Sequence, residues 1–350
     1  MDNYRPPSLK EIKKKWGGKE RFEFVSLFAG GGGSSTGYRM AGGKALAVSE
    51  FIPEAQKSYG SNWPDTHIFT SDVRELTSDH ILEVIKKEAG ELDILDGSPP
   101  CSAFSTAGKR EGGWGKEKKY SDAKQGNIED LFYEYIRILK GLRPKVMVAE
   151  NVSGLIKGSA KHYFNSIIKE IRSAGYFVEC RLLDSKWLGV PQGRTRTIFV
   201  GVREDIYTEG MRLHPKPFGP QIPLREAFHG LEMTEEDKEW TNVSKYAIFE
   251  ELRKLNYGDQ SDKYFSLVKA DPRKYSPCIT ATTGNRGAAS PCHWDDRKFT
   301  IGEIKRIMSV PDDYTLTGKY DQRIERCGRM VPPLMMKAIA DNICENILNV

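Results

Sequence analysis

The most constraining feature of this sequence is a short apolar segment that runs directly into two prolines and a cysteine. Residues 92–95, broken by Asp93, are followed by Asp96 and then by Gly97-Ser98-Pro99-Pro100-Cys101. The pattern predicts a buried parallel strand that ends in a tight turn. The prolines restrict the backbone before Cys101, which therefore lies at the carboxyl end of a strand, the edge where open α/β sheets bind ligands. On this segment alone, Cys101 is either a candidate nucleophile or a buried structural thiol.

Four further segments, 24–28, 45–49, 67–71 and 145–149, also predict strands of such a sheet. The first leads into a glycine-rich turn, residues 29–33, and a helix near 36–40. Strand, glycine turn and helix form an arrangement that lets a nucleotide approach the backbone at a helix N-terminus.

Two acidic residues follow the next strands. Glu50 comes after the second strand, about 20 positions beyond the glycines, and Asp72 comes after the third. A carboxylate at that spacing suits a ribose diol. Either residue alone is equally well explained as a helix cap, but together with the glycine turn they favour an adenosine-containing cofactor.

Length and composition limit the class of protein. The 350 residues suffice for about two domains, and the net charge of +5 permits a polyanionic partner without requiring one. The six cysteines form no Cys-x-x-Cys pair or zinc spacing, so we expect a reducing compartment and no metal. No apolar run reaches the roughly 20 residues of a membrane span, and we expect a cytoplasmic protein without a membrane partner.

Two basic segments have both functional and ordinary interpretations. Residues 1–21 carry seven basic and three acidic side chains, which fits either an arm on nucleic-acid phosphate or a solvated terminus. The segment 107–125, after Cys101, is rich in glycine and lysine, and we favour a closing lid over a plain surface loop.

The second half of the chain adds further candidates. A helix over 127–142 precedes the strand 145–149, which ends at Glu150. Glu150 is therefore a second reactive side chain at the sheet edge where Cys101 is expected. Gln192, Arg194 and Arg196 are expected to share one face of a strand, because they occupy alternate positions before the apolar run 198–202. A helix over 162–174 and a terminal helix over 334–347 are also expected, while 204–300 loses the strand–helix alternation. The loop 280–287 there is either a reader of base edges or phosphate or a plain turn.

Taken in order, these segments resemble the bacterial and phage DNA cytosine-5 methyltransferases. The resemblance rests on Phe28-Ala29-Gly30-x-Gly32, on Glu50, Asp72 and Pro100-Cys101, on Glu150-Asn151-Val152 and Gln192-x-Arg194-x-Arg196, and on the tail from 297 to Pro333. It runs from about Phe24 to the C-terminus, except for roughly 204–276. No single motif is specific, but their order and spacing are.

The resemblance implies a chemistry. The Cys101 thiolate attacks carbon 6 of a flipped-out cytosine, Glu150 holds the ring at nitrogen 3 and the exocyclic amine, and Arg196 binds the carbonyl at position 2, with Arg194 in the same pocket. The resemblance further implies S-adenosyl-L-methionine as cofactor and a set of residues around it: Phe28, Gly30, Gly32, Glu50, Phe51, Asp72, Val73, Pro100, Leu131 and Val331.

One residue departs from the family pattern. The family's tail reads Gly-Asn-x-Val, whereas this chain has Gly328-Arg329-Met330-Val331. A guanidinium suits a carboxylate, so one hypothesis is that Arg329 selects carboxy-S-adenosyl-L-methionine and the enzyme transfers a carboxymethyl group. The alternative is that Arg329 pairs with Glu325 or with DNA phosphate, although Gly328 is expected to interrupt a helix there.

We therefore predict a Rossmann-like α/β class I methyltransferase fold, with a mixed, mostly parallel sheet and helices on both faces, plus a smaller irregular target-recognition domain. The expected division is a basic extension (1–21), a catalytic domain (22–203), a target-recognition domain (204–299), a hinge (300–317) and a returning segment (318–350). The expected partner is double-stranded DNA, bound by a monomer. A tRNA-modifying enzyme and a non-catalytic DNA-binding relative remain alternatives.

Overall fold

The chain forms two compact units in the computed structural model, which describes residues 4–100, 118–119, 124–125, 130–156 and 161–349. The sheet unit comprises Lys15–Leu183, Thr195–Lys216 and the C-terminal stretch from Lys337. The second unit comprises the N-terminal stretch up to Lys14 together with Asp184–Arg194 and Pro217–Met336. Each unit is described by itself.

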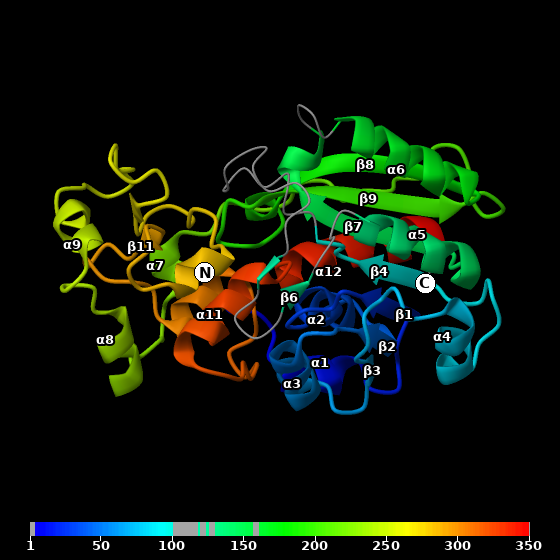
Figure 1. Ribbon diagram of the computed structural model, residues 1–350, viewed down its shortest axis with the longest axis horizontal. Coiled ribbons are helices and arrows are strands. Elements are labelled where there is room, and N and C mark those ends of the chain that lie inside the picture. The colour runs from blue at the N-terminus through cyan, green and yellow to red at the C-terminus, as the bar shows by residue number, and fades with distance from the viewer. Residues whose placement is uncertain (1–3, 101–117, 120–123, 126–129, 157–160, 350) are drawn as a thin grey trace. The chain divides into compact units, whose positions relative to one another are not determined.

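The sheet unit is built on seven strands in the order β3-β2-β1-β4-β7-β9-β8 (Figure 1). Their bounds are β1 Phe22–Leu27, β2 Gly43–Ser49, β3 His67–Phe69, β4 Ile94–Gly97, β7 Val146–Val152, β8 Tyr176–Asp184 and β9 Thr195–Arg203. The pairs from β3 to β7 are parallel, and β9 runs antiparallel to β7. This sheet confirms the predicted mostly parallel α/β fold.

Helices cover both faces of the sheet. They are α2 Gly33–Met40, α3 Pro53–Asn62, α4 Ser78–Ile85, α5 Leu131–Leu142, α6 Lys161–Ser173 and part of α12 Pro333–Ile343, which a π-helical turn follows at Cys344–Leu348. Alternate residues of β1 serve opposite faces, as the pleat of a strand requires. Leu27 joins the core beneath α5, whereas the Phe24 ring lies 4.9 Å from that of Tyr38 in α2.

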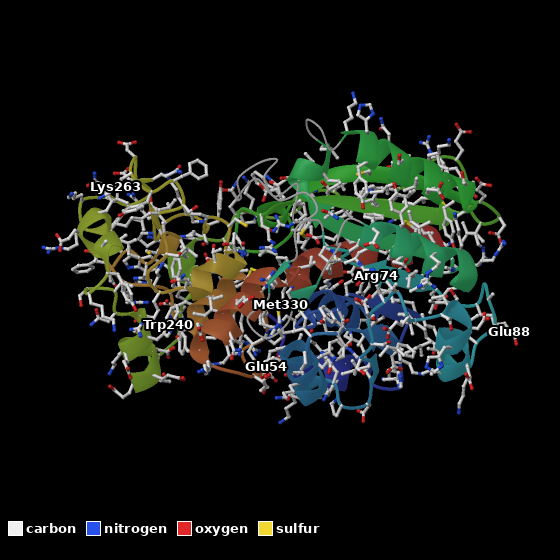
Figure 2. The ribbon with its side chains drawn as sticks, in the orientation of Figure 1. Glu54, Arg74, Glu88, Trp240, Lys263 and Met330 are labelled. Carbon is white, nitrogen blue, oxygen red and sulfur yellow. The ribbon has the colours of Figure 1, made fainter. Side chains whose placement is uncertain are left out.

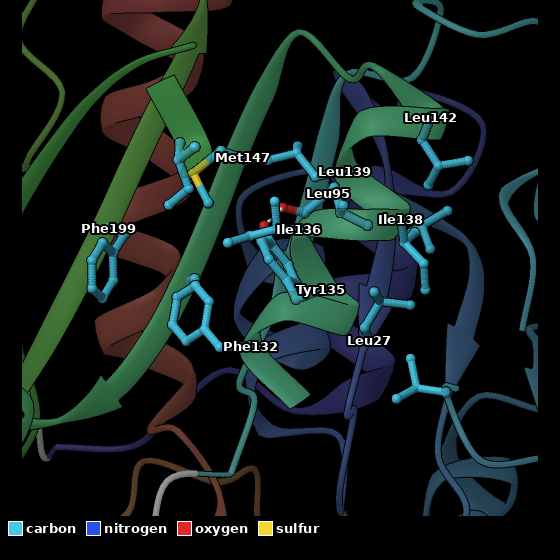
Figure 3. Close-up of a cluster of buried hydrophobic side chains, with 14 of the residues drawn as sticks. Leu27, Leu95, Phe132, Tyr135, Ile136, Ile138, Leu139, Leu142, Met147 and Phe199 are labelled. Atoms are coloured by element: carbon cyan, nitrogen blue, oxygen red, sulfur yellow. Dashed lines mark hydrogen bonds between the residues drawn. The ribbon is translucent and has the colours of Figure 1, made fainter. Parts of the chain in front are cut away.

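The main hydrophobic core lies between α5 and the sheet (Figure 3). Phe132 packs edge-on against Phe199 of β9, with ring centroids 5.4 Å apart. The Tyr135 hydroxyl lies 3.0 Å from the carbonyl oxygens of both Leu95 and Val148, and so links β4 to β7. A Cβ at Gly97 would lie 2.7 Å from the Tyr135 ring, so this packing requires glycine at the end of β4.

The second unit consists of short elements, in agreement with the expected loss of strand–helix alternation. They are most of α1 Leu9–Trp16, a turn at Ser185–Trp187, α7 Leu224–Ala227, α8 Glu235–Thr241, α9 Ala247–Leu252, β10 Val268–Lys269, η6 Ala281–Gly284, β11 Pro291–Cys292, α10 Ile301–Ile307 and α11 Tyr320–Arg329. A separate small core surrounds Leu252, Leu267 and Cys292.

The division of the chain differs from the expected one. Residues 300–336 cluster with the second unit, and the chain returns to the sheet unit only at Lys337. Residues 300–336 belong to the second unit because η6 packs directly on α11 through a close backbone contact. A Cβ at Gly284 would lie 2.5 Å from the Asp321 carbonyl oxygen, and one at Gly328 would lie 2.4 Å from that of Thr280.

Several local expectations also change. α2 begins at Gly33 rather than near 36, and α12 ends at Ile343, before the π-helical turn. Within the basic N-terminal extension, α1 is ordered, with buried Leu9 and Ile12, and the Leu9 amide donates to the Asp313 carboxylate at 2.9 Å.

Candidate active site

The carboxyl ends of the parallel strands bring the candidate residues to one edge of the sheet. In the strand register Leu27 is opposite both Ser49 and Gly97, and Gly97 is opposite Ala149. The residues that follow each strand therefore emerge at the same level. Cys101 itself lies outside the described residues, as does most of the lid candidate 107–125, of which Lys118–Lys119 (β5) and Lys124–Gln125 (β6) pair antiparallel.

The glycine turn after β1 has the backbone geometry that its sequence suggests. Gly30 and Gly32 have φ of 54° and 87°, in the left-handed region where glycine is preferred, and Phe28 has φ of 57°. The Gly30 amide donates to Glu50 Oε2 at 2.7 Å, and the Ile52 amide donates to Oε1 at 2.8 Å. Glu50 thus braces the turn, a role that the sequence did not indicate.

Asp72 lies in an ion-pair network after β3. Its carboxylate accepts from the Arg74 amide at 3.0 Å and from the guanidinium of Arg74, which also donates to Asp130 at 2.7 Å. Figure 2 labels Arg74 on the sheet unit. The hydrogen bond to Asp130 is the main cause that raises the pKa of Arg74. Phe28, Phe51 and Pro100 are half-buried, whereas Val73 and Leu131 belong to the hydrophobic core.

Glu150 and Arg196 form a largely buried ion pair in the sheet unit. Val152 is opposite Arg196 and Glu150 is opposite Ile198, so the two charged side chains are diagonal neighbours on one face. Arg196 Nε lies 2.9 Å from Glu150 Oε1, and only 15% and 11% of the two side chains are exposed. The two side chains that the sequence analysis assigned to one pocket are therefore direct neighbours.

Asn151, next to Glu150, ties its strand to the segment that leads to Cys101. Its Nδ2 donates to the Pro99 carbonyl at 3.1 Å, and its Oδ1 accepts from the Val152 amide at 2.8 Å. The sequence motif contained this residue, but nothing in the spacing indicated its partner 52 positions away.

The expectation that Gln192, Arg194 and Arg196 share a strand face is wrong, because β9 begins only at Thr195. Arg194 is buried in the second unit, where Nη1 donates to the carbonyls of Ile279 at 2.8 Å and Gly328 at 3.2 Å. Gln192 Oε1 accepts from the Ile279 amide at 2.9 Å. Both side chains hold together segments of the second unit.

Arg329 pairs within its own helix. α11 continues through Gly328 to Arg329, so the expected interruption is wrong. Arg329 Nε and Nη2 donate to Glu325 Oε1 at 3.0 and 2.8 Å. The guanidinium therefore has a carboxylate partner one helical turn away. Val331, just beyond the helix, is buried.

A buried carboxylate that the sequence analysis did not assign lies beneath the glycine turn. Asp96 of β4 is 1% exposed and accepts hydrogen bonds from three hydroxyls. Ser26 and Ser34 donate to Oδ2 at 2.6 and 2.7 Å, and Tyr38 donates to Oδ1 at 3.2 Å. Burial raises the pKa of Asp96 from 3.8 to about 6, against the lowering effect of the hydroxyls. An acidic residue inside an apolar strand was the available signal.

Within the described part of the chain, no helix has both the length and the apolar character needed to cross a membrane. The same residues contain no group of three or more histidine, cysteine or acidic side chains arranged to hold a metal ion.

Comparison with known proteins agrees with this geometry. The family model of the C-5 cytosine-specific DNA methylases matches residues 22–345. The chain is 29% identical to type II methyltransferase M1.HphI of Haemophilus parahaemolyticus, over 91% of this chain and 86% of that one. It is also 29% identical to type II methyltransferase M.Sau96I of Staphylococcus aureus, over 92% and 75% of the two chains.

Solved structures share the fold at lower identity. A putative DNA modification methyltransferase encoded within a prophage of E. coli has a TM-score of 0.72 at 20% identity, covering 94% of this chain and all of that one. A mutant DNMT2 of Spodoptera frugiperda has a TM-score of 0.66 at 20% identity, covering 90% and 97%. Because the family model matches almost the whole of this chain, the chain belongs to the C-5 cytosine-specific DNA methylase family.

Proposed function

We propose that this protein methylates carbon 5 of cytosine in double-stranded DNA, with Cys101 as nucleophile and Glu150 and Arg196 as the groups that hold the base. The observation that carries the assignment is the Glu150–Arg196 pair at 2.9 Å, in which Glu150 lies on β7, the strand next to the one that leads into Cys101, and Arg196 lies on β9 beyond it. A carboxylate and a guanidinium side by side complement the edge of cytosine, which presents an amine, a ring nitrogen and a carbonyl in a row.

The reaction follows from these groups. Carbon 5 of cytosine is a poor nucleophile until the Cys101 thiolate adds to carbon 6, which breaks the aromatic system and makes carbon 5 enamine-like. Glu150 stabilises this form at nitrogen 3 and the exocyclic amine, and Arg196 does so at the carbonyl. Carbon 5 takes the methyl group, and loss of its proton with expulsion of Cys101 restores the ring. The base must leave the duplex for this chemistry.

The sheet edge fits S-adenosyl-L-methionine, which supplies an electrophilic methyl group on a sulfonium when bound. The glycine turn leaves its backbone open to approach, because a Cβ placed at Gly30 would meet nothing within 4 Å. Glu50 lies beside this turn, held by the Gly30 and Ile52 amides, and a carboxylate is an acceptor suited to ribose hydroxyls. Phe28 and Phe51 offer half-buried rings for the adenine, and Asp72 offers an acceptor for its amine.

We propose methyl rather than carboxymethyl as the transferred group. The hypothesis of carboxy-S-adenosyl-L-methionine needs the Arg329 guanidinium to bind a carboxylate of the cofactor. Glu325 already supplies a carboxylate at 2.8 Å, so Arg329 need not take one from the cofactor.

The second unit is proposed to read the DNA sequence. The relatives include proteins named type II methyltransferases, and we propose that this chain likewise acts in restriction–modification, as a monomer that recognises one DNA sequence. The loop that contains η6 is held on α11 by backbone contacts at Gly284 and Gly328, which gives a rigid base for side chains such as Asn285 and Arg286.

The test is expression in a bacterial host that lacks DNA cytosine methylation, followed by mass spectrometry of nucleosides from DNA and from tRNA. The wild-type protein is expected to yield 5-methylcytosine in DNA, which sequencing of the modified DNA should locate at one recognition sequence, and Cys101→Ala none. A 5-carboxymethylcytosine product that is lost in Arg329→Asn would establish the larger group. If tRNA were modified and DNA were not, the protein would be a tRNA methyltransferase instead. If neither were modified, only the alternative of a non-catalytic DNA-binding protein would remain.

A further inference from the structure

Beneath the glycine turn, three elements meet at one carboxylate. Asp96 of β4 is directly opposite Ser26 of β1 in the strand register, and Ser34 and Tyr38 lie one turn apart in α2. All four residues are at most 6% exposed. The hydroxyls of Ser26 and Ser34 converge on the same oxygen, Asp96 Oδ2, at 2.6 and 2.7 Å.

These contacts connect the two functional parts of the sheet edge. Ser34 follows Gly32, the last residue of the glycine turn, by two positions, and the helix start at Gly32 has no side-chain cap. Asp96 precedes Gly97 and the Pro99-Pro100 segment that leads to Cys101. The helix α2 is short and its N-terminus has no side-chain cap. The hydrogen bond from Ser34 to the Asp96 carboxylate therefore anchors the first turn of α2 instead.

We propose that Asp96 is a positioning residue that holds the cofactor-binding turn and the strand leading to Cys101 in one arrangement, and that its negative charge is required for tight binding of S-adenosyl-L-methionine. This inference rests on the proposed function, because it presumes that the glycine turn binds this cofactor. A neutral residue of the same size would fill the space equally well, whereas only a carboxylate accepts from all three hydroxyls at once.

The charge requirement gives a pH signature. Burial, with a smaller contribution from the charge of Glu150 on the neighbouring β7, raises the pKa of Asp96 to about 6. The other titratable side chains that face Asp96 are Tyr38 of α2 and Tyr135 of α5, and the pKa of each is raised well above its usual value, mainly by burial, so both stay neutral. Protonated Asp96 donates a hydrogen of its own and cannot accept from all three hydroxyls. Cofactor affinity is therefore expected to fall by about tenfold from pH 8 to pH 5.

The chain offers a matched control in the same helix. Ser35 is as buried as Ser34, but among the described residues its hydroxyl has no hydrogen-bond partner. Ser34→Ala and Ser35→Ala thus remove the same atom from adjacent positions, and only the first removes a contact with Asp96.

The experiment measures the dissociation constant of S-adenosyl-L-methionine for the full-length protein by calorimetry at pH 8 and pH 5, with the thermal midpoint of each variant. Asp96→Asn and Ser34→Ala are expected to weaken binding at pH 8 by about tenfold, and Ser35→Ala by less than about twofold. Asp96→Asn is expected to lose most of the pH dependence. The double variant Asp96→Asn/Ser34→Ala should bind no worse than Asp96→Asn alone.

The outcomes separate this inference from the proposed function. Wild-type protein that binds no S-adenosyl-L-methionine would refute the proposed function, and the role of Asp96 with it. Normal wild-type binding with an unaffected Asp96→Asn, or equal effects of Ser34→Ala and Ser35→Ala, would refute only the role of Asp96. If Asp96→Asn does not fold, the comparison of the two serine variants decides. A lower thermal midpoint with unchanged affinity would show a purely structural role.

Discussion

The pair of Glu150 and Arg196 allows a quantitative prediction about stability. Arg196→Ala leaves the Glu150 carboxylate, 11% exposed, without the guanidinium that now lies 2.9 Å away. Breaking a buried ion pair by removal of one partner costs about 3–5 kcal/mol, because an uncompensated charge remains in a poorly solvated place. Since both side chains retain some exposure, we expect the lower end, a loss of about 3 kcal/mol.

The same sheet contains a control pair. Arg181 and Glu179 of β8 are 3.1 Å apart, but their side chains are 55% and 32% exposed. Exposed pairs contribute about 0–1 kcal/mol, so Arg181→Ala should have a small effect. The double variant Arg196→Ala/Glu150→Gln should recover much of the stability, because it removes the stranded charge, yet it should remain inactive.

Native-state hydrogen exchange of the β7 amides is the suitable assay, because it follows the sheet unit separately from the rest of the chain. A loss below about 1 kcal/mol in Arg196→Ala, or equal losses in the two single arginine variants, would refute the claim that Arg196 stabilises the buried Glu150 carboxylate.

Three further predictions concern other positions. The folded pKa of Asp96, about 6 against 3.8 for a free side chain, means that its ionisation disfavours the fold as pH rises through this window. Asp96→Asn should therefore gain up to about 3 kcal/mol relative to wild type between pH 4 and pH 7 in urea titrations, whereas parallel pH profiles would contradict this. Gly328→Ala places a Cβ 2.4 Å from the Thr280 carbonyl oxygen and should lower the free energy of unfolding by about 1–3 kcal/mol. Hydrogen exchange of the α11 amides measures this loss, and unchanged protection would contradict the prediction. Asn151→Ala loses the bond to Pro99 and should slow single-turnover methylation by about 10- to 100-fold at unchanged cofactor affinity, and an unchanged rate would count against a positioning role.

The parallel sheet could be predicted from the sequence because its strands are buried on both faces and therefore form nearly continuous apolar runs. Glu50, Asp72 and Glu150 were identified as candidates by the same route, since each follows such a run. Their placement at one edge is a consequence of parallel pairing, which needs no knowledge of distant contacts.

The errors arose where distant contacts decide the local structure. The alternation at Gln192, Arg194 and Arg196 does not reveal where a strand begins, and the partners of the first two lie 84 to 134 positions away. Gly328 was expected to interrupt a helix, but it is needed there because the Thr280 backbone approaches α11.

The importance of Asp96 was also missed for a physical reason. Its partners Ser26 and Ser34 are 70 and 62 positions away, and only the register of β1 with β4 brings them together. A lone acid inside an apolar strand indicates that partners exist but does not identify them.

The central claim is that the Cys101 sulfur attacks a cytosine held by Glu150 and Arg196. It is tested most directly with duplex DNA that carries 5-fluorocytosine at the sequence methylated in the expression host, because the fluorine blocks the release of the enzyme from carbon 6. After reaction with S-adenosyl-L-methionine, peptide mass spectrometry should find the nucleotide covalently attached to Cys101. In Glu150→Gln and in Arg196→Ala, this adduct should form much more slowly than in the wild-type protein. Methylation of ordinary DNA without any adduct at Cys101 would contradict the account.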